Sequence, residues 1–181
     1  MKEIILHWQP VINLDELILG KIKIHPAIYV WGWFDADKNF VPYYVGKTNN
    51  LGQRFISHLG CIKGGMYAIY SKEYAISKNF KPLKEEDETR LLYIPSTIKN
   101  WHTKFNTYPV QKNVKWLLKN IRFSWAETSM EDNKDFEKIV YHAFNASTKK
   151  VGAYVKGIPD PTIKVLHTGD ESIQKIVPNL I

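Results

Sequence analysis

Two segments rich in aromatic and β-branched residues dominate the first third of the chain. They are residues 27–34 (AIYVWGWF) and 41–50 (VPYYVGKTNN), and the stretch between them is rich in Asp, Asn and Lys. Strand-forming runs that flank such a polar turn indicate a β-hairpin. Side chains alternate between the two sides of a strand, so we expect Tyr44 to share a side with Tyr29 and Tyr43 to face the other side.

A helical pattern follows the hairpin. Apolar residues recur at helical spacing between Asn49 or Asn50, either of which suits an N-cap, and Gly60, where we expect the helix to end. These apolar residues are Leu51, Phe55, Ile56 and Leu59. Arg54 and His58 are four residues apart and therefore point to the same side of this helix.

The remaining pattern predicts several shorter elements. Residues 1–8 and 162–169 resemble strands, residues 13–20 a short helix and the C-terminal end another short helix. Residues 121–127 (IRFSWAE) alternate like a third strand of the hairpin sheet. Two longer helices are expected at 109–120 and within 128–148, where Phe136, Ile139, Val140 and Phe144 form an apolar stripe.

These elements predict an α+β fold, a three-stranded antiparallel sheet flanked by helices. We expect one domain at residues 26–145, with a helical and loop insertion at about 61–120. Residues 1–25 form an N-terminal extension, and residues 146–181 a C-terminal extension packed on the domain.

Composition narrows the class of protein. The chain has 181 residues and a net charge of +7, which favours a polyanionic partner, above all nucleic acid. A single cysteine, Cys61, excludes an internal disulfide and a multi-cysteine zinc site. No signal-peptide pattern and no apolar run of membrane-spanning length is present, so we expect a cytoplasmic protein with no membrane partner.

The predicted elements display polar residues that suit phosphodiester hydrolysis. The hairpin carries Tyr29 and Tyr44, the next helix carries Arg54 and His58, and the later helix carries Glu137. Arginine offers a fork of donors matched to phosphate. A lone carboxylate suits one Mg²⁺ that keeps most of its waters.

The order of these residues resembles the GIY-YIG nuclease superfamily. Its first motif is matched by Ala27-Ile28-Tyr29 and its second by Tyr44-Val45-Gly46, followed by Arg54, His58 and a helical glutamate, Glu137. The resemblance covers roughly residues 26–145. Ala27 replaces the first motif's glycine, the spacing between the motifs is long, and the segment before residue 121 is longer than in minimal members.

The resemblance implies a role for each motif residue. Tyr29 and Tyr44 take part in activating water, Arg54 steadies the scissile phosphate, and His58 assists proton transfer or orients a tyrosine. Glu137 binds a single Mg²⁺ or Mn²⁺; Glu127 and Glu131 are rival ligands.

Further residues are weaker candidates for nucleic-acid contact. Lys47 follows the second motif's glycine and either contacts a phosphate or is only solvated. Asn145 is the nearest match to an asparagine often found in the family. Lysines lie among aromatics within 61–120, which we expect to face the DNA together with the C-terminal region.

We therefore expect a metal-dependent DNA endonuclease of the restriction, repair or mobile-element kind, with RNA as a substrate left open. One alternative is a non-catalytic nucleic-acid-binding module that keeps the fold. Another is an interaction protein whose basic charge is incidental.

Overall fold

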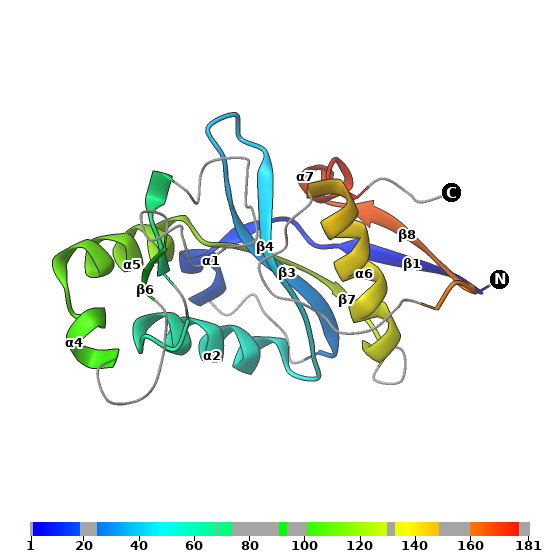
Figure 1. The fold of residues 1–181 in the computed structure, drawn as a ribbon. Coiled ribbons are helices and arrows are strands. Elements are labelled where there is room, and N and C mark those ends of the chain that lie inside the picture. The colour runs from blue at the N-terminus through cyan, green and yellow to red at the C-terminus, as the bar shows by residue number, and fades with distance from the viewer. Residues whose placement is uncertain are drawn as a thin grey trace.

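The computed structural model describes residues 2–18, 25–67, 69–73, 91–93, 101–129, 133–148 and 160–177. They form an α+β fold around a six-stranded sheet (Figure 1). The strands of this sheet are β1 (Lys2–Trp8), β2 (Ile12–Asn13), β3 (Ala27–Phe34), β4 (Phe40–Thr48), β7 (Arg122–Glu127) and β8 (Ile163–Gly169). The helices are α1 (Leu14–Ile18), α2 (Leu51–Lys63), α4 (Trp101–Phe105), α5 (Tyr108–Asn120), α6 (Asn133–Thr148) and α7 (Glu171–Gln174). A separate small ladder pairs β5 (Ile69–Tyr70) with β6 (Leu91–Tyr93).

The sheet is larger than the sequence predicted. Its order is β4-β3-β7-β1-β8, with β2 also paired to β7. The antiparallel trio β4-β3-β7 corresponds to the three predicted strands, whereas β8 runs parallel to β1. The prediction of a three-stranded antiparallel sheet is therefore wrong, because pairing between the distant ends of the chain leaves no local sequence pattern.

The two terminal segments join the same sheet. The β1–β8 ladder runs from the pair Lys2 and Ile163 to the pair Trp8 and Gly169. Beyond it, the Asp170 side chain caps α7 and accepts a hydrogen bond from the backbone N–H of Val11 at 3.0 Å. Segments assigned as extensions from the sequence thus supply two strands and part of the core.

Helix α2 begins as predicted but ends later. The Asn50 side chain accepts a hydrogen bond from the N–H of Gln53 at 3.0 Å, which identifies the N-cap. The helix continues through Gly60 to Lys63 and ends at Gly64, so the predicted end at Gly60 is wrong. A glycine that faces open space late in a helix lowers helix propensity without breaking the hydrogen-bond ladder.

A β-bulge in the hairpin changes the direction of one tyrosine. Trp31 pairs with Tyr44 but Gly32 pairs with Pro42, so Tyr43 is the extra residue on β4. Only a glycine fits at position 32, because a Cβ there would overlap the carbonyl of Val41. Tyr43 and Tyr44 both contact the Trp31 ring, with centroid distances of 4.7 and 6.0 Å. The prediction that they face opposite sides is therefore wrong.

The central sheet has two differently covered faces. Tyr29 and Trp31 of β3 pack with residues of α2, α4 and α5, whereas Ile28 and Val30 pack with residues of α6 and α7. Alternation along β3 therefore puts α2 and α6 on opposite faces. Figure 1 shows α2 and α6 on different sides of the β3–β4 hairpin. Within the described part of the chain, no helix has the length and apolar character to cross a membrane.

Candidate active site

Three of the predicted site residues form one hydrogen-bonded group on the α2 face. The Tyr29 hydroxyl lies 2.7 Å from Nε2 of His58 and accepts a hydrogen bond from Nε of Arg54 at 2.9 Å. Tyr29 and His58 are fully buried, while Arg54 is half-buried at the edge. Arg54 and His58 lie on the same side of α2, as their spacing predicted, and both contact the Tyr29 hydroxyl.

Tyr44 completes the cluster from the edge strand. Nη2 of Arg54 donates to the Tyr44 hydroxyl at 3.4 Å, and the rings of Tyr29 and Tyr44 stack with centroids 5.9 Å apart. One guanidinium thus joins both tyrosine hydroxyls. Tyr44 is half-buried, so the cluster opens toward solvent at the edge strand β4.

Gly46 allows this packing. A Cβ at this position would lie 2.5 Å from the Tyr29 hydroxyl oxygen and 2.6 Å from the Tyr44 ring. Real Cβ atoms do not approach other atoms so closely, so any side chain at residue 46 would displace the two tyrosines. The glycine of the second motif is therefore a steric requirement of the cluster.

The electrostatics keep the buried groups neutral. Burial raises the pKa of Tyr29 far above its usual value; the neighbouring Tyr44 adds to the rise and Arg54 only partly opposes it. Burial, assisted by the charge of Arg54, lowers the pKa of His58 to about 4. Burial alone would lower the pKa of Arg54, but its contacts with the tyrosine hydroxyls raise it overall. At neutral pH the cluster therefore contains one cation, a neutral phenol and a neutral imidazole.

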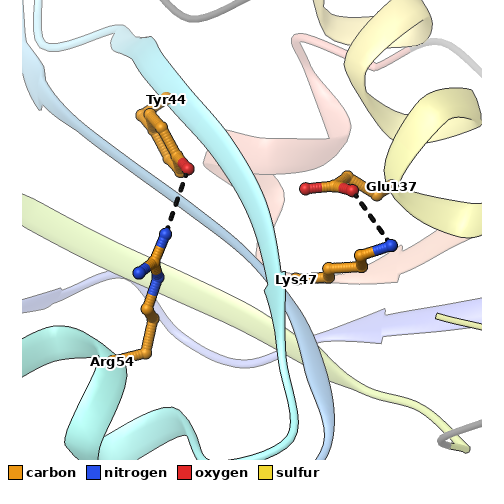
Figure 2. A network of polar contacts seen from close by, with 4 residues as sticks. All are labelled: Tyr44, Lys47, Arg54 and Glu137. Carbon is orange, nitrogen blue, oxygen red and sulfur yellow. Dashed lines mark hydrogen bonds and ion pairs between the residues drawn. The ribbon is translucent and has the colours of Figure 1, made fainter. Parts of the chain in front are cut away.

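Glu137 approaches β4 from the opposite face. Figure 2 shows Tyr44 and Arg54 on one side of β4, with Lys47 and Glu137 on the other. Nζ of Lys47 lies 3.4 Å from Oε2 of Glu137, and the Glu137 side chain is only 20% exposed. Among the described residues, Glu137 bonds to Lys47 and not to the tyrosine cluster. The structure thus brings Glu137 to the same edge strand but leaves it outside the hydrogen-bonded group.

The residues at Glu137 fit a divalent ion only with water and substrate as further ligands. No group of three or more His, Cys, Asp or Glu side chains within the described ranges is arranged to hold a metal. A single carboxylate suits a Mg²⁺ that keeps most of its waters. Lys47 already places a positive charge beside this carboxylate, so an ion there would have to displace the ammonium group.

One residue of the cluster was missed by the sequence reasoning. Nδ1 of His58 lies 2.8 Å from the hydroxyl of Tyr67, which comes just after α2. Tyr67 belongs to a segment that we expected to face DNA. The pair is nine residues apart and the chain turns between them, so neither helical nor strand spacing indicates the contact.

A buried donor lies beside the same cluster. The Trp31 indole N–H makes no hydrogen bond with the described residues, and the Trp31 ring lies 6.1 Å from the His58 ring. A buried donor without a partner is uncommon in native proteins. Asn145 lies on α6, and its side chain is outside those that the structure describes, as are the rival ligand Glu131 and its segment.

Comparisons with protein-family models, with curated proteins and with solved structures found no match for this chain. The resemblance to GIY-YIG nucleases therefore remains an expectation from the motif residues of the sequence.

Proposed function

We propose that this chain is a divalent-metal-dependent endonuclease that hydrolyses DNA phosphodiester bonds. One observation carries the proposal: a single arginine, Arg54, hydrogen-bonds to two tyrosine hydroxyls while a buried histidine contacts one of them. A guanidinium that extends to the half-buried edge of such a cluster suits a phosphate oxygen.

The chemistry follows from the protonation states. Tyr29 is a buried, neutral phenol at rest, so it accepts a proton from a water that enters at the Tyr44 edge only as its own proton passes to Nε2 of His58. The water oxygen bonds to phosphorus as the ester bond to the departing oxygen breaks. The departing oxygen takes a proton from solvent, and His58 afterwards returns one proton to solvent. Arg54 stabilises the negative charge that develops on the phosphate.

Glu137 would hold the divalent ion of this reaction. A bound Mg²⁺ or Mn²⁺ supplies Lewis-acid stabilisation of phosphate oxygens. The residues on either side of β4 would then face one substrate phosphate from two directions. Lys47, on the same side of β4 as Glu137, would release the carboxylate and contact the DNA backbone.

Helix α5 supports nucleic acid as the partner. Its Lys112, Lys115 and Lys119 are exposed and spaced to lie on one side, and α5 contains no acidic residue. The opposite side of the helix, which carries Val110, Val114 and Leu117, packs into the core on the α2 face of the sheet. Helix α5 therefore lies on the same face of the sheet as α2, the helix that carries Arg54. Its charge suits the phosphates of DNA and equally those of RNA.

The deciding experiment is cleavage of plasmid and oligonucleotide pools, DNA and RNA, with Mg²⁺ and with EDTA. The wild-type protein should cut DNA only with the metal, and Arg54→Ala and Glu137→Ala should each abolish cutting. Arg122→Ala and Glu3→Ala are matched controls, because Arg122 bonds backbone carbonyls and Glu3 is exposed on β1, where it pairs with Lys164. Cutting that persists in the Arg54 and Glu137 variants would contradict the site.

DNA binding has its own test. Replacing Lys112 and Lys115 by alanine should lower the slope of log affinity against log salt by about two, one for each lost phosphate contact. Replacing Lys2 and Lys38, which are exposed on β1 and in the turn between β3 and β4, should leave the slope unchanged. Equal slopes in the two double variants would exclude α5 from the interface.

One observation favours a second function, a non-catalytic nucleic-acid-binding module. The ion pair of Lys47 with Glu137 neutralises the carboxylate that catalysis needs for a metal. Salt-dependent binding of DNA or RNA without cleavage of either would support this alternative.

A further inference from the structure

His58 is held between two tyrosine hydroxyls. Its Nε2 lies 2.7 Å from the Tyr29 hydroxyl and its Nδ1 lies 2.8 Å from the Tyr67 hydroxyl. Both ring nitrogens of a fully buried imidazole therefore have partners. Tyr67 is half-buried, and its ring also packs on the His58 ring, with centroids 5.8 Å apart.

The proton of His58 can occupy either nitrogen. A neutral imidazole has one N–H donor and one acceptor nitrogen, and a hydroxyl can serve as donor or acceptor. Tyr29 already accepts a hydrogen bond from Arg54, which can only donate. This accepted bond draws electrons from the Tyr29 oxygen and favours donation of the Tyr29 proton to Nε2.

We propose that Tyr67 is a positioning residue whose oxygen accepts the Nδ1–H of His58 and so keeps Nε2 open for the Tyr29 proton. The proposal rests on the hydrolysis proposed above, in which that proton moves to His58. One proton moves from water to Tyr29 and one from Tyr29 to His58. Tyr67 keeps its own proton throughout and makes no contact with substrate.

The surroundings of Tyr67 suit an orienting role. Its hydroxyl also interacts with the Cys61 thiol, so its proton has a neighbour other than His58. Burial, with this thiol, raises the pKa of Tyr67 to about 12, and the hydroxyl stays neutral at physiological pH. A neutral partner fixes the direction of the imidazole and its tautomer without the added basicity that a carboxylate would give.

The tautomer can be measured without substrate. Two-bond ¹H–¹⁵N correlation spectra of protein labelled with ¹⁵N-histidine distinguish a protonated from an unprotonated ring nitrogen. In the wild type, the His58 signal, assigned by its loss in His58→Gln, should show Nδ1 protonated and Nε2 unprotonated. A spectrum with Nε2 protonated would overturn the proposal, whether or not any variant folds.

The matched variants are Tyr67→Phe, which removes one hydroxyl, and Tyr108→Phe, an exposed tyrosine at the start of α5. Tyr67→Phe should move the His58 proton toward Nε2 and lower kcat for DNA cleavage about tenfold, with KM unchanged. Tyr108→Phe should leave the spectrum unchanged, because Tyr108 is exposed and makes no contact with His58 among the described residues. An unchanged tautomer in Tyr67→Phe would overturn the proposal.

The proposed hydrolysis and the positioning role of Tyr67 can each be disproved without the other. If the wild type cuts no nucleic acid but the spectra show the expected tautomer and its shift, the proposed hydrolysis fails and the orienting contact stands. If the wild type cuts and Tyr67→Phe cuts at the same kcat, the hydrolysis stands and the positioning role is wrong.

Discussion

Among the residues that the structure describes, two histidines are buried, one on each side of the sheet, and their surroundings differ. His58 lies on the α2 face between two tyrosines and near Arg54, whereas His167 lies on β8 and accepts a hydrogen bond from the Trp8 indole at 2.9 Å. Burial lowers the pKa of both to about 4. Burial and a shifted pKa therefore do not separate a candidate catalytic histidine from a structural one.

The bonding partners make the difference. An indole N–H can only donate, so it fixes Nδ1 of His167 as an acceptor and the histidine as neutral. The hydroxyls around His58 can donate or accept, so a proton can pass through that ring. Hydroxyl partners that can donate or accept, next to a cation, therefore indicate a catalytic histidine. A partner in the core that can only donate indicates a structural one.

The largest expected effect separates the two histidines by activity. Glutamine can replace either histidine as a hydrogen-bond partner but cannot accept a proton. His58→Gln should lower the cleavage rate by a factor of about 10² to 10⁴, the usual contribution of a positioned proton acceptor. His167→Gln should cut at nearly the wild-type rate under single-turnover conditions. Equal losses in both variants would mean that the histidine at the tyrosine cluster has no special role.

The next effect concerns stability at acid pH, to which both histidines contribute. Each has a folded-state pKa of about 4, below the value of about 6.5 in the unfolded chain. The unfolded state therefore binds more protons between these values, and stability falls as the pH drops from about 6.5 toward 4. Each histidine should cost about 2 kcal/mol between about pH 7 and pH 5.

Urea unfolding at the two pH values measures this loss. His167→Gln should remove about half of the histidine contribution, because His58 still titrates. A pH dependence identical to the wild type would show that His167 binds its proton equally in both states.

A pair of glycines tests how tightly the α2 face is packed. Gly46→Ala should push the two tyrosines apart, with a loss of about 1–3 kcal/mol in unfolding free energy and of most cleavage activity. Gly60→Ala meets no atom within 4 Å and should stabilise α2 by about 0.5–1 kcal/mol. Thermal unfolding of both variants provides the comparison. A Gly46→Ala variant as stable as the wild type would mean that the cluster is loosely packed.

The smallest effect is expected on the opposite side of β4. Lys47→Met removes the ammonium that pairs with Glu137, a partly exposed ion pair worth at most about 1 kcal/mol. The metal concentration for half-maximal cleavage should therefore fall by a factor of about five or less. Binding of Mn²⁺ measured by calorimetry checks this without cleavage. Weaker metal binding in Lys47→Met would show that the lysine helps to build the metal site.

Much of the local structure was predictable from the sequence. The hairpin of β3 and β4, the helices α5 and α6, and the strand β7 are all confirmed, because alternation and helical spacing are short-range signals. Of the two asparagines predicted as the N-cap of α2, the structure identifies Asn50. The spacing of Arg54 and His58 also correctly predicted that they face one side.

Apart from the end of α2, where Gly60 is tolerated within the helix, long-range arrangement accounts for what the sequence pattern did not indicate. The bulge at Tyr43 depends on the close approach of Gly32 to the neighbouring strand. The position of Glu137 depends on which face of the sheet α6 covers. The contact of Tyr67 with His58 depends on the turn after α2. Each of these arrangements depends on a contact between two segments. The periodic pattern within a segment does not indicate which other segment it will contact.

The sequence by itself determined the elements and the residues that could do chemistry, since local backbone preferences and side-chain types are written in neighbouring residues. Only the tertiary structure decided that Tyr29, Tyr44, Arg54 and His58 share one hydrogen-bonded cluster, with Glu137 across the edge strand. It also decided that β1 and β8 extend the sheet. The physical reason is that burial, pairing partners and protonation state depend on groups brought together from distant parts of the chain.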